Sequence, residues 1–268
     1  MKNYNRISVT LAVVGICLAA ASGAYAQIST INSAVINSRV FNDMPSATGN
    51  YINAYPGSIT LGETGAFRST SGGLDRDYWE FSNNGSSFYV FGAGDTSFTA
   101  SMTLDVTGTT AFDNEAGWII PNGNTAGFGQ GNGTLPGGDL QFLADPNSGF
   151  LGFFGGPGFW NSGFTYVAGT TVTMKMQYFQ TGSTGNMIFS VTDGSSTSVS
   201  PLESWTGNLA GDLLGSYYQI GNGGTAPGAS GQAVYGNISI TSVVPEPSTL
   251  ALLGLGILPL ARLLRRRA

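Results

Sequence analysis

Two short acidic segments hold the residues best suited to chemistry in this sequence. Asp113 and Glu115 stand two residues apart in Asp113-Asn114-Glu115. Residues i and i+2 of a strand share one face, and hydrolysis of a glycosidic bond needs two carboxyl groups that face each other across the sugar. This pair, however, lies beside an expected turn and lacks a third acid. We therefore expect no catalysis from Asp113 and Glu115.

The second acidic segment, Asp75-Arg76-Asp77, contains its own counter-charge. With Arg76 between the two acids, this pattern favours a surface ion pair or a loop cap. Calcium binds Asp, Asn and backbone carbonyl oxygens, which glycine-rich loops present readily. Calcium at Asp75 with Asp77, or at Asp113 with Glu115, is therefore an alternative to solvated acids in turns, although no EF-hand spacing occurs. We expect no other cofactor.

Several catalytic residue types are missing. The chain has no histidine, and Cys17 is its one cysteine. This excludes imidazole general bases, Ser-His-Asp and Cys-His relays, and HExxH zinc sites. Because Cys17 lies in a segment that we expect to be removed, the mature chain would also lack thiols for disulfides, metals or nucleophilic attack. The expected protein is not an enzyme.

The densest aromatic run covers residues 149–161, GFLGFFGGPGFWN. Sugar rings dock on flat aromatic faces, and neighbouring amides and acids bond their hydroxyl groups. A candidate carbohydrate platform here consists of Phe159, Trp160 and Asn161. Most large aromatic residues are buried, so core positions are favoured for Phe150, Phe153 and Phe154. For Trp160, core and surface are equally open.

Acids outnumber bases in the central part of the chain. Residues 27–244 contain four basic and fourteen acidic residues, a net charge of −10. This field repels phosphate backbones and anionic lipids, which argues against nucleic-acid binding. An acidic surface rich in Ser, Thr, Asn and Gly suits the outside of a cell, where neutral polysaccharide and divalent cations are natural neighbours.

Apolar residues of this body alternate with a period of two. In 98–106, as in 172–178, 187–192 and 234–241, every second residue is apolar, which is typical of half-buried strands. Less regular strand candidates are 59–61, 78–81, 88–91, 118–120, 140–144, 150–154 and 217–220. Turn signals rich in Gly, Asn and Asp separate most of them, and no long helical stripe occurs. The sequence therefore predicts an all-β sandwich or jelly roll.

The N-terminus has the three parts of a secretory signal. Lys2 and Arg6 precede an apolar run, and the small residues Ala24 and Ala26 form the Ala-Tyr-Ala pattern that signal peptidase recognises. We expect cleavage before Gln27, because the apolar run is short for a membrane anchor and a cleavage site follows it at once.

The C-terminal residues combine a proline-rich motif, an apolar run and a basic end. Pro245 and Pro247 hold Glu246 in extended chain, a form that can enter a protease active site. The 17 residues 248–264 would reach roughly 26 Å as a helix, which just spans a bilayer. Four arginines would keep the end cytoplasmic: Arg262, Arg265, Arg266 and Arg267. An ordinary membrane anchor is the alternative.

This three-part tail resembles the PEP-CTERM sorting signal, over residues 244–268. The resemblance implies a Gram-negative bacterium that secretes exopolysaccharide, and processing near Pro-Glu-Pro by a membrane-embedded exosortase. Export, transient tethering in the inner membrane, and then transfer to the cell surface or release would follow. The same tail is also named an ice-binding-protein C-terminal motif, but a sorting tail transfers no activity to the body before it.

The body resembles a concanavalin A-like, or laminin G-like, jelly roll over about residues 76–241. The strand 98–106 is followed by Glu115-Ala116-Gly117 and an aliphatic strand. A Leu-x-Phe strand at 140–142, Phe-Gly-Gly at 154–156 and the strand 172–178 then come in the expected order. The resemblance implies this fold and contact with glycans, without naming a ligand.

These observations predict four segments: a signal peptide at 1–26, an N-terminal extension at 27–57, a β-sandwich at 58–243 flanked by the two terminal helices, and the sorting signal at 244–268. The expected function is a non-enzymatic protein of the cell surface or extracellular matrix, associated with exopolysaccharide. A lectin-like carbohydrate-binding module and a glycoside hydrolase with an unrecognised acid pair are the alternatives. Expected partners are signal peptidase, the exosortase, polysaccharide and, before processing, the membrane.

Overall fold

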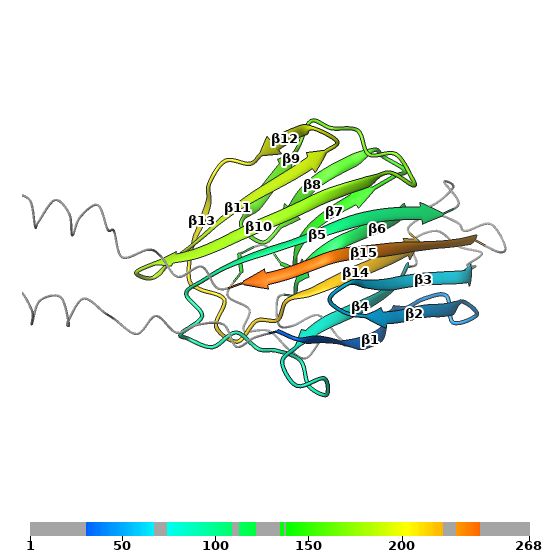
Figure 1. The fold of residues 1–268 in the computed structure, drawn as a ribbon, viewed down its shortest axis with the longest axis horizontal. Helices are drawn as coiled ribbons and strands as arrows, with labels where there is room; N and C mark the ends of the chain where they lie inside the picture. The colour runs from blue at the N-terminus through cyan, green and yellow to red at the C-terminus, as the bar shows by residue number, and fades with distance from the viewer. Residues whose placement is uncertain are drawn as a thin grey trace, which may run out of the picture. The chain divides into compact units, whose positions relative to one another are not determined.

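The computed structural model describes residues 31–66, 74–108, 113–121, 135–136, 138–221 and 229–241. They form two antiparallel β-sheets (Figure 1). The expected signal peptide and sorting tail, with their helices, lie outside the described residues. Within the described part, no helix is long and apolar enough to cross a membrane.

The first sheet has seven strands in the order β1-β4-β14-β6-β7-β8-β9. Its strands are β1 (Ser33–Asn42), β4 (Leu74–Ser82), β14 (Gly215–Gly221), β6 (Asp113–Ile120), β7 (Leu140–Asp145), β8 (Phe150–Gly155) and β9 (Gly158–Asn161). Strands β6 to β9 form a meander, whereas β14 enters between β4 and β6 from far along the sequence. The central strands therefore join residues from both halves of the body.

The second sheet has eight strands in the order β12-β11-β10-β5-β15-β3-β2, with β13 also paired to β11. Its strands are β12 (Ser196–Val199), β11 (Thr184–Asp193), β10 (Thr171–Thr181), β5 (Ser97–Gly108), β15 (Ala229–Thr241), β3 (Ser58–Ala66), β2 (Thr48–Ala54) and β13 (Glu203–Thr206). The chain crosses between the sheets repeatedly, as from β4 to β5 and back to β6. The predicted all-β jelly-roll sandwich is confirmed.

The core lies between the two sheets and follows the predicted alternation. In β5, the side chains of Phe98, Ala100, Met102, Leu104 and Val106 are buried, while the residues between them are partly exposed. Aromatic rings from both sheets meet in this core. Phe153 of β8 stacks on Phe189 of β11 with ring centroids 4.0 Å apart, and Phe142 of β7 meets the same ring at 5.1 Å. Burial of such rings holds the sheets together, since truncating one costs ~3–5 kcal/mol.

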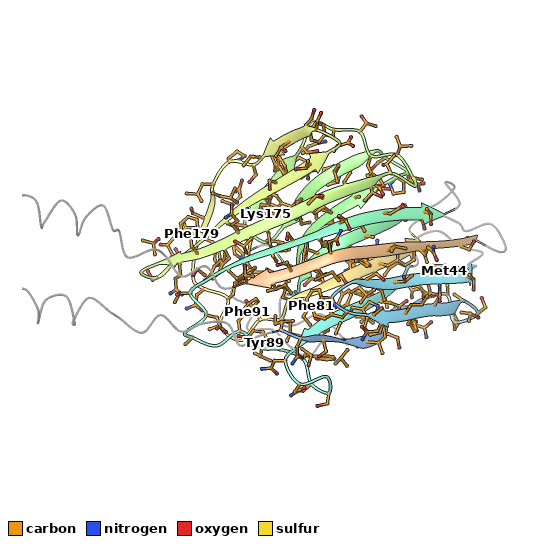
Figure 2. All side chains as sticks on the ribbon, in the orientation of Figure 1. Met44, Phe81, Tyr89, Phe91, Lys175 and Phe179 are labelled. Carbon is orange, nitrogen blue, oxygen red and sulfur yellow. The ribbon has the colours of Figure 1, made fainter. Side chains whose placement is uncertain are left out.

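Aromatic residues also close the sandwich beside the end of β4. The Tyr89 N–H donates to the Phe81 carbonyl at 2.8 Å, and Phe91 stacks on Phe98 at 5.1 Å (Figure 2). Both rings of this segment are buried. The segment 88–91, expected as a strand, is described as a loop with a single bridge from Val90 to Leu213.

The expected surface position of Asp75-Arg76-Asp77 is wrong. These residues lie in β4 with β1 on one side and β14 on the other, and all three are buried. The Asp75 carboxylate accepts the Met44 N–H at 2.9 Å, and the Asp77 carboxylate accepts the Tyr51 hydroxyl at 3.0 Å. These polar partners come from distant segments, so the local pattern of charges did not indicate them.

The stretch 27–57, expected as an extension, contributes strands to both sheets. Strand β1 pairs with β4, and β2 pairs with β3. The described residues all belong to one compact unit, Gln27–Val243. Strands β1 and β2 of this unit therefore belong to the two sheets of the sandwich.

One edge of the eight-stranded sheet is divided. Strands β12 and β13 both pair with β11, but they meet different halves of it. The segment between them contains Pro201, which has no N–H to donate. Ser200 reaches back to β11, because its hydroxyl accepts the Phe189 N–H at 2.9 Å.

Candidate functional site

The outer face of the seven-stranded sheet, which points away from the other sheet, carries a second side-chain layer. Its hydrophobic part is a separate cluster of Tyr78, Ile119, Leu143 and Tyr217. Cross-strand register arranges the outward residues in rows. The first row is Val35, Glu80, Gly215, Ile119, Gln141, Phe154 and Phe159. The second row is Asn37, Tyr78, Tyr217, Gly117, Leu143, Gly152 and Asn161. The third row begins with Phe41, Arg76, Gln219 and Glu115.

Arg76 is the centre of the polar part of this face. Its guanidinium donates from Nε to Oε1 of Gln219 at 2.7 Å, and a second N–H reaches the same oxygen. The remaining contacts are Oε1 of Gln141 at 3.5 Å, the Tyr78 hydroxyl at 3.4 Å and the Asp139 carboxylate at 3.8 Å. The Gln219 amide then donates to Glu115 at 3.3 Å. We call these six residues the Arg76 network.

Aromatic rings enclose the Arg76 charge. The guanidinium carbon lies 5.3 Å from the ring centroids of both Phe41 and Tyr217. Tyr217 in turn meets Tyr78 edge to face at 6.3 Å. A cation held between ring faces is stabilised by the ring quadrupoles, more strongly when water is excluded. The site thus holds one buried cation, Arg76, between aromatic rings and beside the carboxylates of Asp139 and Glu115.

The ionisation of this network follows from its burial. Burial alone would lower the pKa of Arg76, but the hydroxyl groups of Tyr78 and Tyr217 and the Glu115 carboxylate outweigh it and raise the pKa. Burial raises the pKa of Tyr78 and Tyr217 well above the usual value of a phenol. Arg76 therefore stays charged, and both tyrosines stay protonated donors, at any physiological pH.

Glu80 lies on the same face of β4 as Arg76 and Tyr78. Its side chain is fully buried, and its carboxyl oxygens make no hydrogen bond within the described part of the chain. Burial raises its pKa to about 8. The neighbouring Gly215 makes room for it, because a Cβ there would lie 2.8 Å from the Glu80 carboxyl and 2.9 Å from the Trp79 carbonyl oxygen. Glu80 is thus an acid that is held neutral at pH 7.

The predicted aromatic platform is divided between the two sides of β9. Phe159 points outward and is 67% exposed, and its ring lies 5.6 Å from Phe150 on β8. Trp160 is half-buried and packs on the core, 6.5 Å from Phe153. Asn161 is exposed on the same side as Phe159, and its side-chain oxygen accepts the Gly163 N–H at 2.9 Å. Phe159, rather than Trp160, is therefore the exposed ring.

Burial divides the other aromatic residues of this run in the same way. Phe153 is buried as expected, whereas Phe150 and Phe154 are half-buried on the outer face. The strip of Phe150, Phe154 and Phe159 continues the rows of the Arg76 network toward the β9 edge. We call these three residues the phenylalanine strip.

The candidate calcium ligands lie on different faces. Asp75 and Asp77 alternate with Arg76 on β4 and point inward, whereas Glu115 points outward into the Arg76 network. The Asp113 side chain lies outside the description. Among the residues that the structure describes, no group of three His, Cys, Asp or Glu side chains could hold a metal ion. Calcium thus remains a sequence-based prediction.

The Arg76 network was missed in the sequence, although one signal pointed to it. Its members Gln219 and Gln141 sit at outward positions between large inward neighbours, Tyr218 and Ile220 in one strand and Leu140 and Phe142 in the other. Strands with large residues at both alternate positions are buried on both faces. That pattern indicates a covered outer face, but it cannot pair residues that are 143 positions apart.

The comparisons with known proteins concern the tail and the fold separately. Residues 243–267 match the PEP-CTERM protein-sorting motif. The predicted tail resemblance is confirmed, and Pro245, Glu246 and Pro247 fall within the match. Such a motif indicates export followed by sorting at the membrane. The comparison with curated proteins finds no match to the chain.

Among solved structures, the sandwich is similar to plant lectins and to a polysaccharide lyase. Arcelin-5, a lectin-like defence protein from Phaseolus vulgaris, is 13% identical with a TM-score of 0.45, covering 80% of this chain and 99% of that chain. Lectin I from Ulex europaeus, in complex with the methyl glycoside of α-L-fucose, is 11% identical with a TM-score of 0.44, covering 80% and 99%. The family 7 alginate lyase A1-II′ is 11% identical with a TM-score of 0.44, covering 72% and 83%.

Proposed function

We propose that this chain is an exported, non-enzymatic protein of the cell surface or extracellular matrix, whose seven-stranded sheet binds polysaccharide on its outer face. The observation that carries the proposal is the phenylalanine strip beside the Arg76 network. The tail supports the location, because the PEP-CTERM motif is a sorting signal. An exosortase would act near Pro-Glu-Pro and release the body or transfer it to the surface.

The phenylalanine strip has the form that a sugar needs. Phe159 exposes 67% of its surface, and it is braced by Phe150 at an interplanar angle of 33°. Flat rings of this kind accept the apolar faces of pyranose units, while polar groups at the edge fix their orientation. Asn161 on the neighbouring row supplies an exposed amide, and Glu115 and Asp139, the partly exposed members of the Arg76 network, supply acceptors. An extended chain of neutral sugars could therefore run along these rows.

Binding rather than hydrolysis is proposed because the acids of this face are unsuited to act as a pair. Glu115 and Asp139 are both held in the Arg76 network, whereas Glu80 is fully buried and lies in a different row. An acid pair for glycoside hydrolysis has to flank the scissile bond. Turnover of β-glucans that disappears in Glu115→Gln would contradict the proposal that the chain is not an enzyme.

A glycan array, followed by affinity electrophoresis of the secreted protein in the host's exopolysaccharide, tests the binding site. Phe159→Ala should weaken binding by ~1–3 kcal/mol, as expected for a stacking residue at the centre of a site. The matched control is Phe179→Ala, which removes a 36% exposed phenylalanine from β10 in the other sheet. Equal losses in both variants, or no loss in Phe159→Ala, would overturn this binding site.

A further inference from the structure

A hollow opens at the end of the sandwich where β15 ends. It has a volume of about 370 Å³ and is lined by Ile238, Ser239 and Ile240 of β15, by Tyr55 and Pro56 of the turn between β2 and β3, and by residues that precede β1. Ile31, the first described residue, belongs to this last group. None of the lining residues carries a charge, although the body as a whole has a net charge of −10.

Hydrogen bonds make the walls of this hollow rigid. The backbone N–H groups of Asn237 and Ile238 donate to the carbonyl oxygens of Gly57 and Pro56, each at 3.1 Å. The Tyr55 ring packs on the core at 5.9 Å from Phe81. The described walls of the hollow are thus held in place by contacts within the sandwich.

The length of the following chain brings the sorting motif close to this hollow. Strand β15 ends at Thr241, and three residues separate it from Pro245. Four Cα-to-Cα steps reach at most ~14 Å, even when the chain is fully extended. A peptidase that acts near Pro-Glu-Pro therefore works within that distance of Thr241.

Resting on the proposed function, we infer that the hollow formed by Tyr55, Pro56 and residues 238–240 is a docking site for the processing peptidase. Its occupant is an extracytoplasmic loop of the membrane-embedded exosortase, with apolar and uncharged side chains to match the lining. The body and the motif then form one substrate, in which docking raises the local concentration of Pro-Glu-Pro at the active site.

The charge of the body favours this occupant over the lipid surface. A body with a net charge of −10 is repelled by anionic lipids, so attraction to the bilayer does not hold this end of the sandwich at the membrane. An uncharged hollow in an acidic body instead provides a contact that is free of this repulsion. A second copy of the chain would bring the same net charge to the interface, which opposes self-association there.

The test follows processing of the full-length chain by pulse labelling and immunoblotting in a bacterium that carries an exosortase. Ser239→Arg places a charged side chain at an exposed position on the rim of the hollow. Thr173→Arg is the matched control, because it makes the same kind of change at an exposed position of β10. Ser239→Arg should slow conversion of the precursor about fivefold, equivalent to ~1 kcal/mol. Thr173→Arg should convert at the wild-type rate.

Insertion of a flexible Gly/Ser linker between Thr241 and Pro245 separates docking from simple crowding. If the body docks, the linker alone slows processing, and it also removes the difference between Ser239→Arg and wild type. If the body merely obstructs the peptidase, the linker accelerates processing, which overturns the inference. Equal rates for Ser239→Arg and Thr173→Arg also overturn it.

Two controls keep this result distinct from the sorting proposal. Melting temperatures of the secreted variants verify that each body is folded. A strain without the exosortase should accumulate the precursor of every variant. If the wild-type precursor persists even when the exosortase is present, the sorting proposal itself fails together with the docking site.

Discussion

The outer faces of the two sheets differ in how deeply their polar side chains are buried. On the seven-stranded sheet, Arg76, Gln141, Gln219 and Glu80 are all buried. On the eight-stranded sheet, an in-register row of Thr197, Thr192, Thr173 and Thr103 crosses four strands and is partly or fully exposed to water. Lys175, on the neighbouring row, carries the charge of β10 (Figure 2).

This contrast shows how alternation and burial are separate properties. Both sheets use a period of two, and both bury one face against the same core. The second face is set by residue size and by partners. Small hydroxyl residues of the second sheet remain in water, whereas Arg76 of the first sheet donates hydrogen bonds to Gln219, Gln141 and Tyr78. Specific binding requires such fixed groups, so the two faces should differ in stability and ligand response.

The largest expected difference concerns the two cations. Arg76→Ala should lower the free energy of unfolding by ~3–5 kcal/mol, because it leaves the buried Gln219 oxygen without its donor and Asp139 and Glu115 without a neighbouring positive charge. Lys175→Ala should change it by less than ~0.5 kcal/mol, as expected of a surface substitution. Urea unfolding of both variants measures this. Similar small losses would show that the Arg76 network contributes little to stability.

Glu80 should make stability depend on pH. Its pKa is raised to about 8 in the fold against 4.5 for the free group, so its stabilising contribution is complete below about pH 4.5 and is lost as the pH rises to about 8. Glu80→Gln removes this dependence and should become the more stable protein by ~2–4 kcal/mol at pH 8 and above. Unfolding of both proteins between pH 4 and pH 9 gives the comparison. If the free energies of unfolding of the two proteins changed with pH in the same way, this would contradict the neutral, buried state of Glu80.

Two glycines on the outer faces provide a smaller test. Gly215→Ala should cost ~1–3 kcal/mol, because its Cβ would meet the backbone oxygen of Trp79 as well as the Glu80 carboxyl. In Gly236→Ala the close neighbour is the Thr103 hydroxyl at 2.8 Å, a side-chain end that can rotate away. Thermal unfolding should therefore distinguish the two variants. A larger loss of stability in Gly236→Ala than in Gly215→Ala would contradict the expected difference in packing between the two outer faces.

The smallest expected stability effects are those of the exposed phenylalanines. Phe159→Ala and Phe179→Ala should each change the free energy of unfolding by less than ~1 kcal/mol, because both rings keep much of their surface in water. Their melting temperatures should thus nearly coincide, while polysaccharide binding falls in Phe159→Ala only. A drop of several degrees in Phe159→Ala would instead make its ring part of the fold.

The sequence predicted the fold better than it predicted the site, for a physical reason. Alternation in segments such as 98–106 and 172–178 is local, and both segments are strands of the sandwich. The Arg76 network depends on register between β4, β14 and β6, which no local pattern contains. Charge was even misleading at Asp75-Arg76-Asp77, because buried acids and solvated acids look alike until their partners are known.

The aromatic run shows the same limit on a smaller scale. Residues 159–161 include one exposed ring, but the sequence could not decide whether Phe159 or Trp160 carries it. Strand β9 puts Phe159 and Trp160 on opposite sides, and only the position of the core determines which side is exposed to solvent. The sorting tail was predictable for the opposite reason, since Pro245, Glu246 and Pro247 are recognised as a linear segment.

The divided edge formed by β12 and β13 bears on how the protein behaves at high concentration. An open strand edge offers unpaired backbone groups to which another molecule can add a strand, the first step of fibre growth. Here the outermost strands are only four residues long each, and Pro201 interrupts the ladder between them. At high concentration, another molecule would therefore find little open strand to pair with at this edge. Contacts between molecules would be made by the side chains on the outer faces of the sheets instead.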